Sequence, residues 1–249
     1  FIPATTDISK LPAYVLNASV ETLKFPTVWK SSIAIDQNLG AGFSLTVEGI
    51  FNKNINALRY IDANLKAADS KLAGPDQRER FPSSRFINSA TQSAFILANT
   101  NVGRSYSLTT KLEKAPGKNG LGGMIGYTYG DATDLQSVAS TVLANIPTTR
   151  GQNYLAEAIA DNNLRHRAVG FINYVLDYKK LFDAVGGKTL FTLGFEYSAG
   201  SPLTYTVSGD LNRDGQNNDL MYIPNKGSDI TFASLTASGK TFTPAQQQE

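Results

Sequence analysis

A chain of 249 residues can form one large domain or two small ones, and its net charge of +2 argues against nucleic-acid binding, which needs a concentrated basic face. The absence of cysteine excludes a disulfide framework and a thiolate site, and no stretch approaches the roughly 20 apolar residues of a membrane-spanning helix. Hydrophobic residues make up 41% of the chain but alternate with polar ones rather than forming blocks, which favours β structure.

Six long runs of β type follow one another along the chain, and their joints alternate in length. The short joints are 39–42, 115–120 and 180–187, and the long ones are 60–92, 132–162 and 208 onward. Outer-membrane barrels place short turns on the periplasmic side and long loops outside, so the first run is expected to descend and the second to ascend. The predicted runs are Thr27–Leu39, Phe43–Arg59, Ser93–Lys114, Leu121–Asp131, Asn163–Lys179 and Lys188–Val207.

In most runs, apolar and polar residues sort onto opposite faces, but the fifth run fits less well, because Phe171 shares a face with Arg167. In the first, Trp29 and Ile33 lie on one face, while Lys30 and Asp36 lie on the other. Soluble strands have about 5–6 residues and tilted membrane strands about 9–11, so the length of these runs favours a barrel over a β-sandwich. Tyrosines near the predicted strand ends either form an interfacial girdle or simply fill the strands: Tyr127, Tyr129, Tyr178, Tyr197 and Tyr205.

The candidate metal site lies in the last long loop. Asp210, Asn212 and Asp214 alternate and are followed by Gly215, which matches positions 1, 3, 5 and 6 of a calcium loop. Hard oxygen donors at this spacing converge, and the carbonyl of Gln216 provides position 7. Position 12 is not the usual glutamate, so Asp219 would have to contribute from position 10. The alternative is a polar surface turn, because these are also turn residues.

Catalysis is not expected. His166 is the only histidine and is flanked by two arginines, so it has no partners for a triad and is predicted to occupy a strand end. The chain has no Gly-x-Ser-x-Gly elbow. The segment Leu155–Ala160 is predicted to form a short helix over the barrel mouth.

Several sequence segments resemble those of the TonB-dependent receptors of Bacteroidetes type, especially the Oar-like group. These are Phe25–Gln37, Val47–Ala57 and Leu97–Tyr106, and the most specific is Ser198–Tyr205 running into Gly209–Gly215 and Asn218–Pro224. The order is preserved from about Pro26 to Pro224.

This resemblance implies that residues 1–249 are part of one antiparallel transmembrane β-barrel domain. It implies about six strands of a larger barrel, in this class 22-stranded with a plugged lumen. The plug, the motif that engages TonB and the closing strands are not found in this sequence, so we expect a piece of a longer protein. The implied location is the outer membrane of a Gram-negative bacterium, where the chain contacts lipid and the rest of its barrel and plug.

The implied function is energised uptake of an unidentified ligand with the TonB system as partner, and a surface lipoprotein is a further candidate partner. A second hypothesis is a non-transporting outer-membrane scaffold for assembly or adhesion. A third is a soluble calcium-binding β-sandwich. No cofactor other than Ca²⁺ is suggested.

Overall fold

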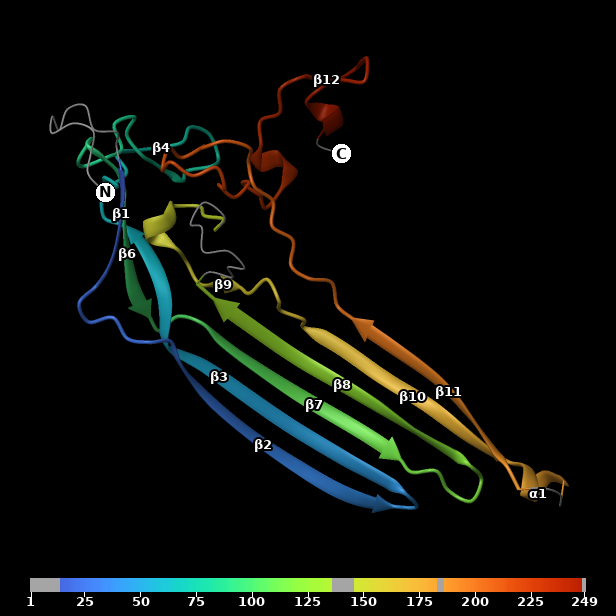
Figure 1. Cartoon of the computed structure of the whole chain (residues 1–249). Helices are drawn as coiled ribbons and strands as arrows, with labels where there is room; N and C mark the ends of the chain where they lie inside the picture. The colour runs from blue at the N-terminus through green and yellow to red at the C-terminus, as the bar shows by residue number, and fades with distance from the viewer. Residues whose placement is uncertain (1–13, 136–145, 183–185, 248–249) are drawn as a thin grey trace, which may run out of the picture.

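Nearly all regular structure in the computed structural model is β structure (Figure 1). The structure describes residues 14–135, 146–182 and 186–247. Within them, no helix is long and apolar enough to cross a membrane. The all-β prediction is confirmed. The main sheet contains β1 (Tyr14–Ser19), β2 (Thr27–Gly40), β3 (Phe43–Asp62), β6 (Thr91–Thr100), β7 (Arg104–Lys114), β8 (Leu121–Asp134), β9 (Ala158–Ile159), β10 (His166–Asp177) and β11 (Lys188–Ser198).

Smaller elements lie at both ends of this sheet. Two-residue strands β4 (Ser70–Lys71) and β5 (Glu79–Arg80) pair with each other, as do β12 (Leu235–Ala237) and β13 (Lys240–Phe242). A short helix, α1 (Tyr178–Phe182), follows β10. Single 3-10 turns occur at Gln152–Tyr154, Gly227–Asp229 and Ala245–Gln247.

Six long strands form an antiparallel meander in the order β2, β3, β7, β8, β10, β11. Figure 1 shows the turns after β2, β7 and β10 at one end of the sheet and the long connections at the other, as the loop lengths predicted. Within the described residues, β2 pairs only with β3 and β11 only with β10, so the sheet is not closed.

One face of the meander is apolar over all six strands. Ile125 on β8 lies opposite Leu112 of β7 and Gly170 of β10, and the same face carries Ile33 on β2 and Leu193 on β11. Exposed fractions of 51% for Ile125, 73% for Ile33 and 76% for Leu193 show that no described segment covers this face. So large an apolar surface is unfavourable in water and requires an apolar surrounding.

The height of this face matches a membrane. On β2 it runs from Trp29 to Leu39, both of which are exposed. At about 3.3 Å per residue and a tilt of about 40°, these positions cover about 25 Å, the height of the apolar band on outer-membrane barrels. The opposite face is mostly polar, as in the hydrogen bond from Thr46 to Asp36 (2.6 Å) across β2 and β3, although the paired Met124 and Phe171 also lie on it.

An aromatic cluster marks the loop end of the apolar face. The Tyr127 hydroxyl and His166 Nδ1 are 2.7 Å apart, and the ring centroid of Tyr129 lies 5.3 Å from that of His166 and 6.2 Å from that of Tyr106. His166 is the first residue of β10, which confirms the predicted strand-end position. Tyr127 and Tyr129 fit the girdle interpretation, whereas Tyr205 lies outside the strands.

Two of the predicted runs had wrong boundaries, and one strand was not predicted. The run Ser93–Lys114 is interrupted at residues 101–103, where Gly103 has a φ of 107°, although Ala57 opposite Thr100 and Lys53 opposite Arg104 keep one register. The last run ends at Ser198 rather than Val207, and Pro202 beyond it lacks the N–H that a strand needs. β1 was not predicted; it pairs in parallel with β6.

The helix predicted in the connection before β10 was also wrong. The segment Leu155–Ala160 contains β9 rather than a helix, and Ile159 pairs with Thr133 of β8. Six residues form too few helical hydrogen bonds to be stable, and the edge of β8 provides backbone partners instead. The joint 180–187, expected to be a tight turn, begins inside α1; residues 183–185 lie outside the described residues.

Candidate functional site

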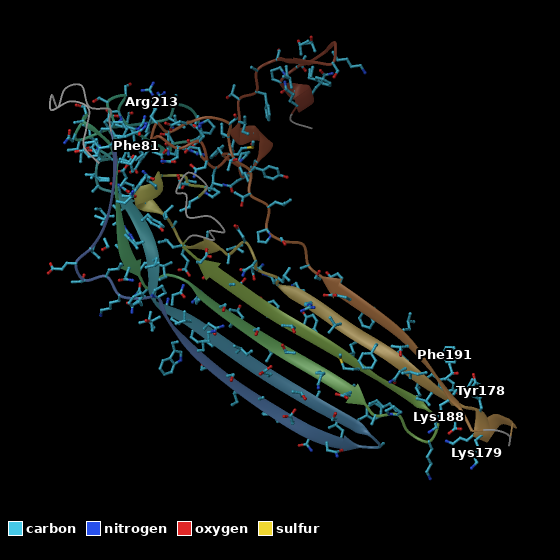
Figure 2. The ribbon with its side chains drawn as sticks, viewed as in Figure 1. Phe81, Tyr178, Lys179, Lys188, Phe191 and Arg213 are labelled. Carbon is cyan, nitrogen blue, oxygen red and sulfur yellow. The ribbon has the colours of Figure 1, made fainter. Side chains whose placement is uncertain are left out.

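The buried residues of the protein gather at the loop end of the sheet. Phe81 is completely buried, and most of the buried polar residues lie in the same region: Asp62, Asn64, Thr148, Gln152, Asn212, Asp214, Asn218 and Asp219. They come from three segments, 62–92, 146–163 and 206–221. We call these three segments together the loop assembly. In Figure 2, Phe81 and Arg213 mark it above the end of the sheet.

Backbone hydrogen bonds connect the three segments. The N–H of Phe81 donates to the carbonyl of Asn212 (2.8 Å), and the N–H of Leu220 donates to the carbonyl of Thr148 (2.8 Å). At the upper end of β3, the backbone N–H of Asp62 donates to Asn153 Oδ1 (2.7 Å), and Asn153 Nδ2 donates back to the carbonyl of Asp62 (2.8 Å). The loops are thereby fixed to one another and to the sheet.

Side chains reinforce these contacts at the surface and inside. Arg150 forms a two-pronged ion pair with Glu79, with N–O distances of 3.0 and 3.2 Å. Arg213 donates to Ser83 (3.1 Å), and the buried amide of Gln152 donates to Asp62 Oδ2 (3.3 Å). A rigid scaffold with loops packed on it is a common way to present a recognition surface.

Gly151 is required by the packing around Phe81. Its φ is 86°, and an added Cβ would lie 2.9 Å from Phe81 Cε2 and 3.2 Å from Asp214 Oδ2. We expect Gly151→Ala to destabilise the loop assembly by about 1–3 kcal/mol, through backbone strain and overpacking. Limited proteolysis of the loops should therefore accelerate. Gly200→Ala is the matched control, because its Cβ would meet no atom within 4 Å. Equal cleavage rates in the two variants would contradict the packing described.

The predicted calcium residues lie in the loop assembly, where Asn212, Asp214 and Asp219 are buried and Asp210 and Gln216 are half-buried. Three hydrogen bonds fold the loop back on itself: Gly215 N–H donates to Asp210 Oδ2 (2.9 Å), Asp214 N–H to Asn212 Oδ1 (2.8 Å) and Gln216 N–H to Asp214 Oδ1 (2.8 Å). Gly215 has a φ of 94° and Arg213 one of 67°, so the turn is tight on both sides of Asp214.

Asp219 closes the loop from its far end. Its Oδ2 accepts hydrogen bonds from the backbone N–H groups of Leu211 (2.7 Å) and Asn212 (3.2 Å). Its other oxygen lies 4.0 Å from a guanidinium nitrogen of Arg78 and has no hydrogen-bond partner. Metal ligation by Asp219 therefore stays a prediction, whereas its role in fixing the loop backbone is present in the structure.

The aspartate side chains of this loop are poorly solvated. Burial, reinforced by the charges of Asp219 and Asp210, raises the pKa of Asp214 to about 6, although the backbone N–H of Gln216 opposes the shift. Burial likewise raises the pKa of Asp219. Within the described part of the chain, no three His, Cys, Asp or Glu side chains form a metal-binding group by themselves. Any cation site here would need amide or carbonyl oxygens as well.

Two arginines of the segment 62–92 lie close to this loop. The Arg85 guanidinium packs against Gly215, with its Nε 2.7 Å from the position of an added Cβ. The side chain of Arg78 is 5% exposed and pairs with Asp76 at 2.8 Å. No local sequence signal identified these arginines or Phe81 as buried, because the segments that bury them lie far away in the chain.

The exposed apolar face, the polar opposite face and the outward loops together define a membrane-spanning β-sheet of the outer-membrane barrel class. Comparison with known families agrees: residues 2–247 match the outer membrane beta barrel domain, and the chain belongs to that family. Its location is accordingly the outer membrane. Neither the curated proteins nor the solved structures gave a significant match.

Proposed function

We propose that the chain is a segment of a TonB-dependent outer-membrane transporter that takes up a ligand through a plugged barrel. The observation that supports the proposal most is the open six-stranded meander. Unpaired edges on β2 and β11 would leave backbone groups unsatisfied in lipid, so they need further strands of a larger barrel. All 249 residues would then belong to one barrel domain, and the sequence resemblance favours the TonB-dependent type.

In this proposal the loop assembly captures the ligand and the polar face lines its path. The polar face offers hydroxyl groups and charges that suit a hydrated lumen, such as Thr109 and Thr128, which are hydrogen-bonded across β7 and β8 at 2.9 Å. The protein would have no catalytic activity of its own. Lipid, the remaining strands and plug, TonB and a surface lipoprotein are the proposed partners.

A genetic test separates transport from a scaffolding or adhesion role. Four strains are compared for growth on a panel of limiting nutrients. They are the wild type, a strain without this gene, a strain without TonB and the double mutant. A transporter predicts a nutrient on which both single deletions grow poorly and the double deletion grows no worse. Additive defects, or a defect of this deletion in cell attachment alone, would contradict the transport proposal and favour the scaffold.

A further inference from the structure

The buried centre of the loop assembly contains carboxylate oxygens without partners. Asp214 is 3% exposed; its Oδ1 accepts the Gln216 N–H, but its Oδ2 accepts no hydrogen bond. The backbone N–H of Gln152 faces this carboxylate without meeting hydrogen-bond geometry. Asp210 is arranged in the same way, with Oδ2 bonded to the Gly215 N–H and a buried Oδ1 left over. A buried carboxylate oxygen without a partner is costly unless a cation compensates it.

The free oxygens belong to a loop whose backbone is already folded around them. The Gly215 N–H binds one oxygen of Asp210, and the Gln216 N–H binds one oxygen of Asp214. The second oxygen of each carboxylate is left available. Asn212 is completely buried, and its Nδ2 has no partner either. Its Oδ1 accepts the Asp214 N–H and has a second lone pair that is available to a cation.

We propose that the loop from Asp210 to Gln216 binds one calcium ion through the carboxylates of Asp210 and Asp214, and that the ion stabilises the loop assembly. Asn212, the Gln216 carbonyl and water complete the oxygen shell, which explains why acidic side chains alone do not form a metal-binding group. Calcium is favoured because every donor is a hard oxygen and the shell is irregular, whereas magnesium demands near-ideal octahedral geometry. This proposal is independent of transport and would hold for a scaffold as well.

The arginines near the loop offer the competing explanation, in which cationic side chains alone neutralise the aspartates. Arg78 lies 4.0 Å from the free oxygen of Asp219, beyond hydrogen-bond distance, and its own nitrogen has no partner. Arg80 Nε and Arg85 Nε are also buried without partners. The arginines therefore do not reach the free oxygens of the loop, which are left for a cation.

The test is calorimetric titration of Ca²⁺ alone into the full-length protein, purified in detergent and stripped with a chelator. We expect one site with a Kd of about 0.1–1 mM, the range of extracellular calcium modules. Asp214→Asn and Asp210→Asn should each weaken binding by about tenfold or more. Asp69→Asn, which removes the same charge from an exposed position of the neighbouring loop, should leave it unchanged.

Hydrogen exchange provides the second measurement. Calcium should slow exchange in residues 78–86 and 210–220 of the wild type and of Asp69→Asn, but not of Asp214→Asn. If Asp214→Asn disorders the loops even without calcium, the test uses Asp210→Asn instead, because Asp210 is less buried. Absence of both calcium-dependent heat and protection in the wild type would overturn the proposal, as would equal losses in Asp69→Asn and Asp210→Asn.

Discussion

Ile125→Arg is expected to destabilise the folded protein by about 2–4 kcal/mol. Ile125 lies in the middle of the apolar face of β8, between Leu112 and Gly170, and is 51% exposed. In a soluble protein such a substitution at an exposed strand position would cost little. At the bilayer midplane the guanidinium must be taken out of water, and lipid-facing arginine on membrane barrels costs this amount. Chemical denaturation of the full-length protein in lipid vesicles measures the loss.

The matched control is Met124→Arg, one residue earlier and on the opposite face. Met124 is opposite Glu113 of β7, so an arginine there gains a partner of opposite charge on the hydrated side. We expect its free energy of unfolding to stay within about 0.5 kcal/mol of the wild type. If the two arginine variants lose stability equally, the assignment of the lipid face is wrong.

Phe81→Ala should unfold the loop assembly while leaving the strands intact. Phe81 is completely buried between the segments that carry Gly151 and Asn212, and truncating a buried phenylalanine costs about 3–5 kcal/mol. The few other buried apolar side chains of the assembly, such as Leu65 and Ile146, cannot refill that volume. Hydrogen exchange should therefore become fast in 62–92, 146–163 and 206–221.

Phe25→Ala is the control for this prediction, because Phe25 is 92% exposed and its truncation removes no buried contact. Its exchange pattern should match the wild type. Unchanged protection of the loops in Phe81→Ala would show that polar contacts alone hold the three segments together. Loss of protection in β7 and β8 as well would show that the assembly and the sheet do not unfold separately.

The strands could be predicted from the sequence because the pattern that identifies each strand lies within its own residues. Alternation of apolar and polar residues with period two identifies both the strand and its lipid face, and the glycines at 40 and 42 mark the first tight turn. The interruption at 101–103 could not be predicted, since the residues on either side continue the same pattern. β1 was not predicted because this six-residue strand forms its backbone hydrogen bonds with β6, which is remote in sequence.

The loop assembly was beyond prediction for a related reason. Its contacts join residues far apart in the chain, as in the hydrogen bond from Arg213 to Ser83 across 130 positions. Phe81 lies among charged residues, and nothing nearby distinguishes it from a surface phenylalanine. The spacing of Asp210, Asn212 and Asp214 predicts a calcium loop, and the hydrogen bonds within that loop are seen only in the structure. Only the structure reveals that two of these carboxylates have a buried oxygen without a partner.

The barrel topology places the long loops of the chain outside the cell and its short turns in the periplasm. Because this sequence has no cysteine, single lysines can be replaced and labelled with a membrane-impermeant maleimide in intact cells. Lys71 lies in the loop assembly and Lys118 in the turn after β7, and both are exposed. We predict that Lys71→Cys is labelled in intact cells, whereas Lys118→Cys is labelled only after the outer membrane is permeabilised. Labelling of Lys118→Cys in intact cells, with Lys71→Cys protected or equally reactive, would show that this orientation is wrong.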